Sequence, residues 1–102
     1  MEKIKVMLVD DHEMVRMGLS TYLNITSDIE VIAEASSGHE ALPLLEQHQP
    51  DIVLLDLIME GMDGIETAQR MRTIIKDKQL KTKIIVLTSF AEKEQAVKVI
   101  EA

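Results

Sequence analysis

The chain contains three unbroken apolar runs of four residues, and each run ends in side chains that can handle phosphate or a metal ion. The runs and the polar residues after them are 6–9 with Asp10 and Asp11, 52–55 with Asp56, and 84–87 with Thr88 and Ser89. Short apolar runs of this kind predict strands buried on both faces, as in parallel sheets covered by helices. Because parallel strands end at one edge, where ligands of open α/β sheets bind, we expect these polar side chains to meet there.

Helical periodicities alternate with the strand-like runs, which predicts repeated strand–helix units. The predicted strands are 4–9, 29–35, 52–55 and 84–87, and the predicted helices are 12–25, one between the turn at 36–38 and Pro50, one after the loop at 59–64, and one over 92–101. The first helix carries one apolar stripe, Val15, Leu19 and Leu23. We expect this stripe to lie on the sheet.

Three segments depart from this regular pattern. Pro43 removes a backbone donor in the second turn of the second helix, which predicts a late start, a kink or a separate short helix. Residues 76–83 are polar and rich in lysine, and we expect a solvated loop there. Met14 and Met17 fall outside the apolar stripe of the first helix. Exposed methionines suit an adaptable contact surface, which gives the hypothesis of an interface on the first helix.

The composition fits one globular domain of 102 residues and excludes several kinds of function. The net charge of −7, with no basic cluster, argues against the chain itself binding nucleic acid or an anionic membrane. The absence of cysteine excludes disulfides, thiol nucleophiles and thiolate metal sites. With one tyrosine and one phenylalanine, the core must be aliphatic and rich in methionine. No signal peptide or long apolar segment is present, so the cytoplasm is the expected location.

The predicted edge is strongly acidic and therefore requires a cation. Asp10, Asp11 and Asp56 would repel one another in a partly dry site without a counter-ion. With oxygen ligands only, and with no histidine or cysteine expected close by, the predicted cation is Mg²⁺. Asp56 stands alone at the centre of the edge and is the better nucleophile toward a phosphoryl group, whereas the aspartate pair suits the metal. The Thr88 hydroxyl could donate to a phosphoryl oxygen.

Three further residues flank this edge. His12 follows the aspartate pair, and a histidine at the start of a helix is more commonly a surface or capping residue than a general base. Ile58 lies two residues beyond Asp56, and Phe90 lies two residues beyond Thr88. Both side chains are apolar, so neither can orient a water molecule for attack on a phosphoryl group. We therefore predict that the phosphoryl group is lost slowly.

These motifs resemble those of the receiver domain of bacterial two-component response regulators. The resemblance rests on L-V-D-D-H around Asp10, on L-L-D-L-I-M-E-G-M-D-G around Asp56 and on V-L-T-S-F around Thr88, and it covers residues 3–102. The segment D-D-H-E-M-V-R-M-G-L, and Met-Glu in place of the usual Met-Pro after Asp56, are similar to the NarL/FixJ group. Within that group they resemble most the VraR/LiaR-type regulators of the cell-envelope stress response.

The resemblance implies a CheY-like, flavodoxin-like α/β fold with a parallel sheet of strand order 2-1-3-4(-5). It implies that a sensor histidine kinase phosphorylates Asp56 and that Thr88 is the switch hydroxyl. The implied Mg²⁺ ligands are Asp10 through water, Asp11, Asp56 and the backbone carbonyl of Ile58. Phosphorylation would shift a population between two packings and lead to homodimers and promoter binding through a C-terminal helix-turn-helix domain. The chain would be no enzyme beyond Mg²⁺-dependent self-phosphorylation and self-dephosphorylation.

The family pattern continues past the end of this sequence. Its fifth strand with a lysine that contacts the phosphoryl group, its rotating aromatic residue and its fifth helix would all lie beyond Ala102. We therefore expect residues 1–102 to be a C-terminally truncated receiver domain without a DNA-binding domain. Lys93 and Lys98 are no substitutes for the family lysine, because both fall in the predicted fourth helix.

Other functions fit the motifs less well. A haloacid-dehalogenase-type phosphatase needs a second aspartate two positions after its nucleophile, but Ile58 stands at that distance from Asp56 and His12 at that distance from Asp10. A flavodoxin-like nucleotide binder needs a glycine-rich loop after the first strand, and the loop here is acidic. The alternative that stays open is a truncated receiver that binds partner proteins without being phosphorylated.

Overall fold

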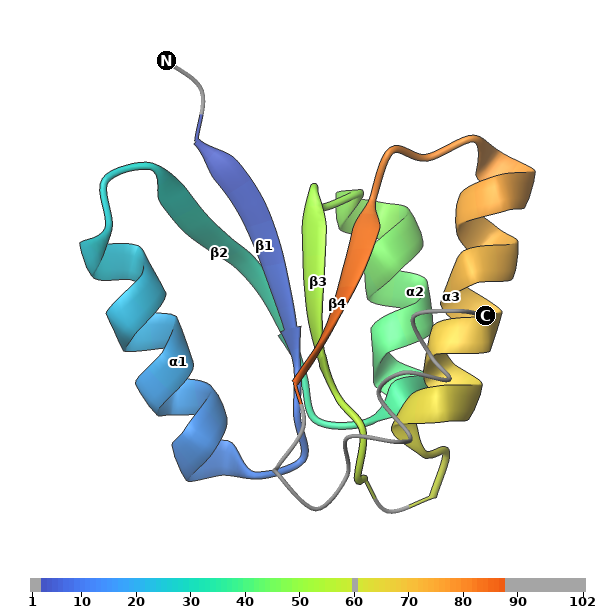
Figure 1. Ribbon diagram of the computed structural model, residues 1–102, viewed down its shortest axis with the longest axis horizontal. Helices are drawn as coiled ribbons and strands as arrows, with labels where there is room; N and C mark the ends of the chain where they lie inside the picture. Colours follow the sequence, from blue (N-terminus) through green and yellow to red (C-terminus); the bar gives the residue numbers. More distant parts are fainter. Residues whose placement is uncertain (1–2, 60, 88–102) are drawn as a thin grey trace.

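The computed structural model describes residues 3–59 and 61–87, which form one sheet with helices on both faces (Figure 1). The strands are β1 Ile4–Val9, β2 Ile29–Ala35, β3 Ile52–Asp56 and β4 Lys83–Leu87, and the helices are α1 Glu13–Ile25, α2 Gly38–His48 and α3 Gly64–Lys78. Neighbouring strands pair in parallel, in the order β2-β1-β3-β4. The predicted CheY-like order is therefore confirmed for these four strands. The predicted fourth helix, 92–101, lies outside the described residues.

The core lies mainly between the sheet and the helices α2 and α3. Figure 1 shows α1 on one face of the sheet and α2 beside α3 on the other. Residues 6–9 of β1 are all buried, as predicted for a strand covered on both faces. The largest buried side chains of the described core are aliphatic or methionine, as expected, and include Met7, Leu45, Leu55, Leu57 and Met71. The two central strands, β1 and β3, thus carry the acidic residues at their carboxyl ends.

Helix α1 covers its face of the sheet only in part. Leu19 and Leu23 are half-buried on the side of β1 and β2, whereas Val15 is 52% exposed. The predicted apolar stripe is confirmed at two of its three positions and wrong at Val15, because α1 is the one described helix on this face. Met14 and Met17 are exposed, as expected. None of the described helices combines the length and the apolar character needed to span a membrane.

Helix α2 is less disturbed by its proline than the sequence predicts. The hydroxyl of Ser37 accepts a hydrogen bond from the backbone N–H of Glu40 at 3.1 Å, so the helix begins at Gly38. It then continues through Pro43 to His48 as one helix. The predicted late start and separate short helix are therefore wrong. The capped first turn and the buried face of the helix outweigh the loss of one backbone donor.

The connector between α3 and β4 is also shorter than predicted. It consists of residues 79–82, so the expected solvated loop over 76–83 is wrong at both ends. Thr82 is buried, and its hydroxyl donates to the carbonyl oxygen of Pro50 at 2.5 Å. The first lysines of the segment lie in the last turn of α3. Lysine suits this position because a positive charge is favourable near the C-terminus of a helix, so composition alone does not separate a helix end from a loop.

Candidate functional site

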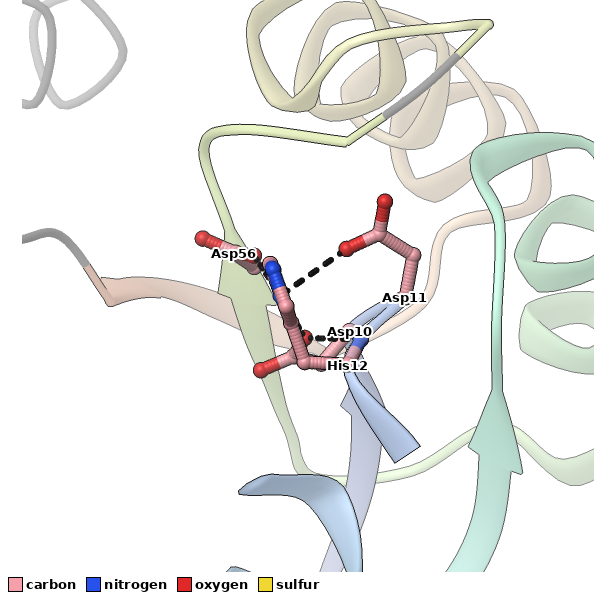
Figure 2. Close-up of side chains that lie close together, drawn as sticks. All are labelled: Asp10, Asp11, His12 and Asp56. Atoms are coloured by element: carbon pink, nitrogen blue, oxygen red, sulfur yellow. Dashed lines mark hydrogen bonds and ion pairs between the residues drawn. The ribbon is translucent and has the colours of Figure 1, made fainter. Parts of the chain in front are cut away.

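Three carboxylates meet at the carboxyl edge of the sheet. Asp10 and Asp11 directly follow β1, and Asp56 is the last residue of β3. The two strands are neighbours and pair in parallel up to the end of β1, which brings the residues after them side by side. Together with His12, these side chains offer atoms that all lie within 4.8 Å of one another (Figure 2). The predicted gathering of the three carboxylates is therefore what the structure contains.

Part of the predicted site falls outside the described residues. Thr88, Ser89 and Phe90 are in this group, so nothing is assigned to their side chains here. Strand β4 is described up to Leu87, which pairs with the last residue of β3. Ile58 is described, and its side chain is 51% exposed. The slow loss of the phosphoryl group, which depends on both apolar side chains, stays a prediction.

Asp10 is the most firmly held of the three aspartates. It is 5% exposed, and its backbone N–H donates to the carbonyl of Ala35 on β2 at 3.0 Å. Its Oδ1 accepts a hydrogen bond from the N–H of His12 at 2.7 Å, and Nη1 of Arg16 donates to its carbonyl oxygen at 2.6 Å. Nε of Arg16 also forms an ion pair with Glu34 at 3.3 Å. Sequence reasoning missed Arg16, whose contact is with the backbone carbonyl of Asp10.

The imidazole of His12 lies among the carboxylates (Figure 2). Its Nδ1 is 3.0 Å from Oδ1 of Asp11, 3.1 Å from Oδ1 of Asp10 and 3.7 Å from Oδ2 of Asp56. The hydrogen bond with Asp10, and then the charge of Asp11, raise the pKa of His12 above its ordinary value of 6.5. His12 holds the N-cap position of α1, but its side chain makes no capping bond. The prediction of a site without a nearby histidine is therefore wrong, because the short turn into α1 directs the ring back over the strand end.

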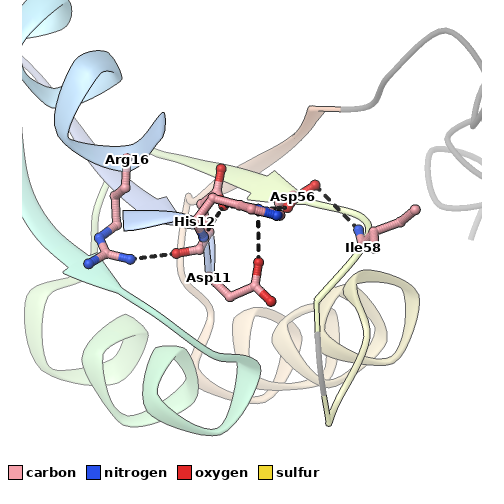
Figure 3. Close-up of polar contacts among 6 residues, drawn as sticks. Asp11, His12, Arg16, Asp56 and Ile58 are labelled. Atoms are coloured by element: carbon pink, nitrogen blue, oxygen red, sulfur yellow. Dashed lines mark hydrogen bonds and ion pairs between the residues drawn. The ribbon is translucent and has the colours of Figure 1, made fainter. Parts of the chain in front are cut away.

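Asp56 combines a strand end with partial access to solvent. Its side chain is 17% exposed, and its Oδ1 accepts a hydrogen bond from the N–H of Ile58 at 3.3 Å (Figure 3). Burial raises the pKa of Asp56 above its ordinary value of 3.8. The N–H of Ile58 opposes this rise in pKa, and the negative charge of Asp10 adds to it. These surroundings disfavour the ionised form of Asp56, and a positive charge nearby would offset that effect.

The loop after Asp56 packs tightly against the start of α3. Leu57 and Met59 are buried, and the N–H of Gly64 donates to the carbonyl of Leu57 at 2.9 Å. A Cβ atom at position 64 would overlap the carbonyl oxygen of Asp56 and the Cα of Leu57. A glycine at this position therefore lets α3 begin directly against the backbone that carries Asp56.

The oxygen donors of this edge fit a hard divalent cation. Asp10, Asp11 and Asp56 bring three negative charges within a few ångströms, which is unfavourable without a positive charge between them. Mg²⁺ prefers oxygen ligands and commonly takes one or two protein carboxylates while it keeps several waters. A carboxylate beside such an ion can also act as a nucleophile toward a phosphoryl group. The geometry is therefore suited to Mg²⁺ and to phosphoryl chemistry.

A family model matches almost the whole chain. Residues 6–102 match the response regulator receiver domain. The chain is 52% identical over 99 residues to the transcriptional regulatory protein LiaR of Bacillus subtilis, a match that covers 97% of the chain and 45% of that protein. It is 46% identical over 99 residues to the response regulator protein VraR of Staphylococcus aureus, across 97% of the chain and 46% of that protein. The chain therefore spans about half the length of these curated relatives.

A solved structure is similar in fold as well. The LuxR-family two-component response regulator from Aurantimonas sp. SI85-9A1 superposes on the chain with a TM-score of 0.86 at 32% sequence identity. The superposition covers 98% of this chain and 69% of that one. The likeness therefore extends from the motifs at the acidic edge to the arrangement of strands and helices that supports them.

Proposed function

The chain belongs to the response regulator receiver domain family, as its resemblance predicts, and on this premise we propose that it is the phosphorylation-controlled part of a transcriptional regulator. In this proposal Asp56 accepts a phosphoryl group from a sensor histidine kinase. The observation that carries it is the meeting of three carboxylates from two neighbouring strands within 4.8 Å. The relationship to VraR/LiaR-type regulators is confirmed by sequence identities of 46% and 52%.

Asp56 is more accessible than Asp10 as the acceptor, and Asp11, whose side chain is 24% exposed, is assigned with Asp10 to the metal. The side chain of Asp56 is 17% exposed at the edge, whereas the side chain of Asp10 is 7% exposed, and Oδ1 of Asp10 is already engaged by the backbone and the ring of His12. In the proposed step, a carboxylate oxygen of Asp56 attacks the phosphorus of a phosphohistidine. A P–O bond forms, and the P–N bond breaks with its electron pair passing to the leaving imidazole, which takes up a proton. The product is an aspartyl phosphate, which water later converts to the carboxylate and inorganic phosphate.

The residues proposed to hold Mg²⁺ are Asp10 through water, Asp11, Asp56 and the backbone carbonyl of Ile58. When bound, Mg²⁺ supplies the positive charge that offsets the carboxylates and the oxygens of the transferring phosphoryl group. The chain's own part is to hold the carboxylates in place. Arg16 does so by donating to the carbonyl of Asp10 at 2.6 Å, and the N–H of Ile58 does so by donating to Oδ1 of Asp56 at 3.3 Å.

Thr88 is proposed as the hydroxyl that senses phosphorylation. It follows Leu87, which pairs with Asp56 and whose carbonyl accepts a hydrogen bond from the N–H of Leu57 at 3.3 Å. This position in the chain supports a role in which the hydroxyl donates to an oxygen of the phosphoryl group on Asp56. The added negative charge then favours one of two packings that lie close in energy, which is a population shift.

The proposed output is a homodimer that binds promoter DNA through a C-terminal domain. The similar proteins are named as a transcriptional regulatory protein and a response regulator, and the chain spans about half of their length. With a net charge of −7 the chain is itself a poor ligand for DNA, so DNA contact is assigned to the other part of the regulator. The chain turns over no separate substrate, because its chemistry is confined to its own aspartate. We propose that the regulator acts in the cytoplasm.

Labelling with acetyl phosphate tests the proposal. In the presence of Mg²⁺, the full-length regulator should gain one phosphoryl group, which intact-mass spectrometry reads directly. Asp56→Asn should gain none, whereas Asp77→Asn, at an exposed position of α3, should be labelled like the wild type. A wild type that gains no phosphoryl group would favour the alternative, a receiver that binds partners without phosphorylation. Labelling of Asp56→Asn would place the acceptor elsewhere.

A further inference from the structure

We propose that Nδ1 of His12 is an additional metal ligand, which makes the acidic edge bind late first-row divalent cations such as Ni²⁺ more tightly than its carboxylates alone would. The inference rests on the proposed function in that it uses the same acidic edge. It differs in its chemistry, because a nitrogen donor is added to a set of oxygen donors. It makes His12 a residue that sets metal preference.

The distances around Nδ1 fit neighbouring ligands of one ion. Two ligands bound at about 2.1 Å lie about 3.0 Å apart at a right angle and about 3.4 Å apart at a tetrahedral angle. Nδ1 is 3.0 Å from Oδ1 of Asp11 and 3.1 Å from Oδ1 of Asp10, with Oδ2 of Asp56 at 3.7 Å. Small side-chain rotations would suffice to close the last distance. These distances are therefore those expected if Nδ1 and the carboxylate oxygens were to hold one cation together.

The backbone holds His12 in this orientation from two sides. Its N–H donates to Oδ1 of Asp10 at 2.7 Å, and its carbonyl accepts from the N–H of Arg16 at 2.9 Å in the first turn of α1. The side chain of Arg16 in turn holds the carbonyl of Asp10 at 2.6 Å. The imidazole does not cap the helix, and it is 63% exposed. A cation from solvent can therefore reach a ring that is already turned toward the carboxylates.

The chemistry of the donors predicts which cations gain from His12. Imidazole nitrogen is a good ligand for nickel, copper and zinc, and affinity for divalent ions at mixed nitrogen and oxygen sites rises along the first row toward copper. Mg²⁺ prefers oxygen and retains its waters. Removal of the imidazole should therefore weaken binding of Ni²⁺ while leaving binding of Mg²⁺ nearly unchanged.

Calorimetric titration of the untagged protein with Mg²⁺ and with Ni²⁺ tests this, because a histidine tag would itself bind nickel. His12→Ala should raise the Kd for Ni²⁺ about tenfold or more and change the Kd for Mg²⁺ by less than about twofold. His39→Ala, an exposed histidine at the start of α2, is the matched control and should leave both constants unchanged. The absorption bands of bound Co²⁺ should also shift in His12→Ala and not in His39→Ala. His12→Gln, which keeps a polar side chain, should behave like His12→Ala and guards against a folding defect.

Three results would overturn the inference. These are an unchanged Ni²⁺ affinity in His12→Ala, an equal loss of affinity for both ions, or tighter binding of both ions. The last result would mean that the imidazole only fills the site as an internal positive charge. Acetyl phosphate labelling of the same variants separates this inference from the proposed function. Labelling on Asp56 with no nickel effect rejects the role of His12 alone, whereas a nickel effect without labelling of the wild type rejects the phosphorylation switch alone.

Discussion

The imidazole of His12 lies near the aspartates at the carboxyl ends of two neighbouring strands, β1 and β3. Its nearest carboxylate oxygen is 3.0 Å away. The hydrogen bond with Asp10 and the charge of Asp11 raise the pKa of this ring, which favours its positively charged form among the three aspartates. Asp10 and Asp11 lie on one side of it and Asp56 on the other (Figure 2). His12 directly precedes α1, so a cation that uses its Nδ1 would connect metal binding with the start of this helix.

We expect His12 to titrate above its ordinary pKa of 6.5 in the metal-free protein, since the hydrogen bond with Asp10 and the charge of Asp11 favour the charged ring. Because the pKa of His12 is higher in the folded protein, the charged ring contributes to folding stability. This contribution is complete below pH 6.5 and is lost as the pH rises through the raised pKa. An NMR titration of the ring protons measures the pKa directly. Asp11→Asn should lower the pKa of His12. A ring that titrates at or below 6.5 in the wild type would contradict the contacts described here.

The sequence could predict the carboxylates of the site but not the ring between them. Asp10 and Asp56 each follow an unbroken apolar run, and the end of a buried strand has a definite place in a parallel sheet. The direction of the His12 ring depends on side-chain torsions, which its partners decide after folding. Arg16 escaped prediction for a similar reason, because its contact is to a backbone carbonyl that no side-chain pattern marks.

Helix α3 packs directly against the backbone that carries Asp56. It begins at Gly64, whose N–H bonds to the carbonyl of Leu57, directly after Asp56. The absence of a side chain at this position allows the helix to approach the strand end. A larger side chain at the first residue of α3 should therefore displace the backbone of the acceptor aspartate, Asp56.

We expect Gly64→Ala to destabilise the protein by about 1–3 kcal/mol, because the added Cβ would overlap the backbone of Asp56 and Leu57. Acetyl phosphate labelling should fall in the same variant. Gly18→Ala is the matched control, since no described atom beyond its own helix turn lies within 4 Å of the added Cβ. This control should stabilise α1 by about 0.5–1 kcal/mol. Urea denaturation measures both changes, and equal stabilities of the two variants would contradict the packing at Gly64.

Element ends could be predicted where an apolar run stops at a polar residue. The observed bounds of β1 and β2 are those expected, because each strand ends at an apolar residue that a polar residue follows. The predicted element ends were wrong where a local helix cap or a contact distant in sequence determines the end. Ser37 starts α2 despite Pro43, and the bond from Thr82 to Pro50 holds the connector before β4. Neither of these interactions has a periodic signature in the sequence.

At the scale of the whole molecule, the two faces of the sheet are covered unequally in the part that the structure describes. Helix α1 lies on one face, and its Met14 and Met17 are 85% and 58% exposed. Exposed methionines suit an adaptable contact with another protein. Since α1 begins at Glu13, directly after the acidic edge, a change at that edge can alter how this surface is presented. This supports α1 as part of the proposed homodimer interface.

We expect Met14→Glu to weaken the phosphorylation-dependent dimer of the full-length regulator by about tenfold or more, because a charge would be placed in an apolar contact. Phosphorylation of Asp56 should be unaffected. Gln69→Glu places the same side chain at an exposed position of α3 and should leave the dimer unchanged. Sedimentation of phosphorylated protein at several concentrations gives the dissociation constants. An unchanged constant for Met14→Glu would remove α1 from the interface.

The fold of the molecule could be predicted more completely than its surface. Apolar runs that end in Asp10 and Asp56, together with alternating helical segments, suffice for a parallel sheet in the observed order. The use of an exposed face is different, because it depends on a partner whose chemistry the chain's own pattern does not contain. The exposure of Met14 was predictable from its place outside the apolar stripe of α1. Its role in a dimer was not predictable from that pattern, and the sedimentation experiment tests it.

The most direct test of the central claim is to locate the phosphoryl group within the chain. After Mg²⁺-dependent labelling of the full-length regulator, borohydride reduction converts an aspartyl phosphate to homoserine, and peptide mass spectrometry reads its position. We predict homoserine in place of Asp56 alone. Homoserine in place of Asp10 or Asp11, or at no aspartate at all, would contradict the account.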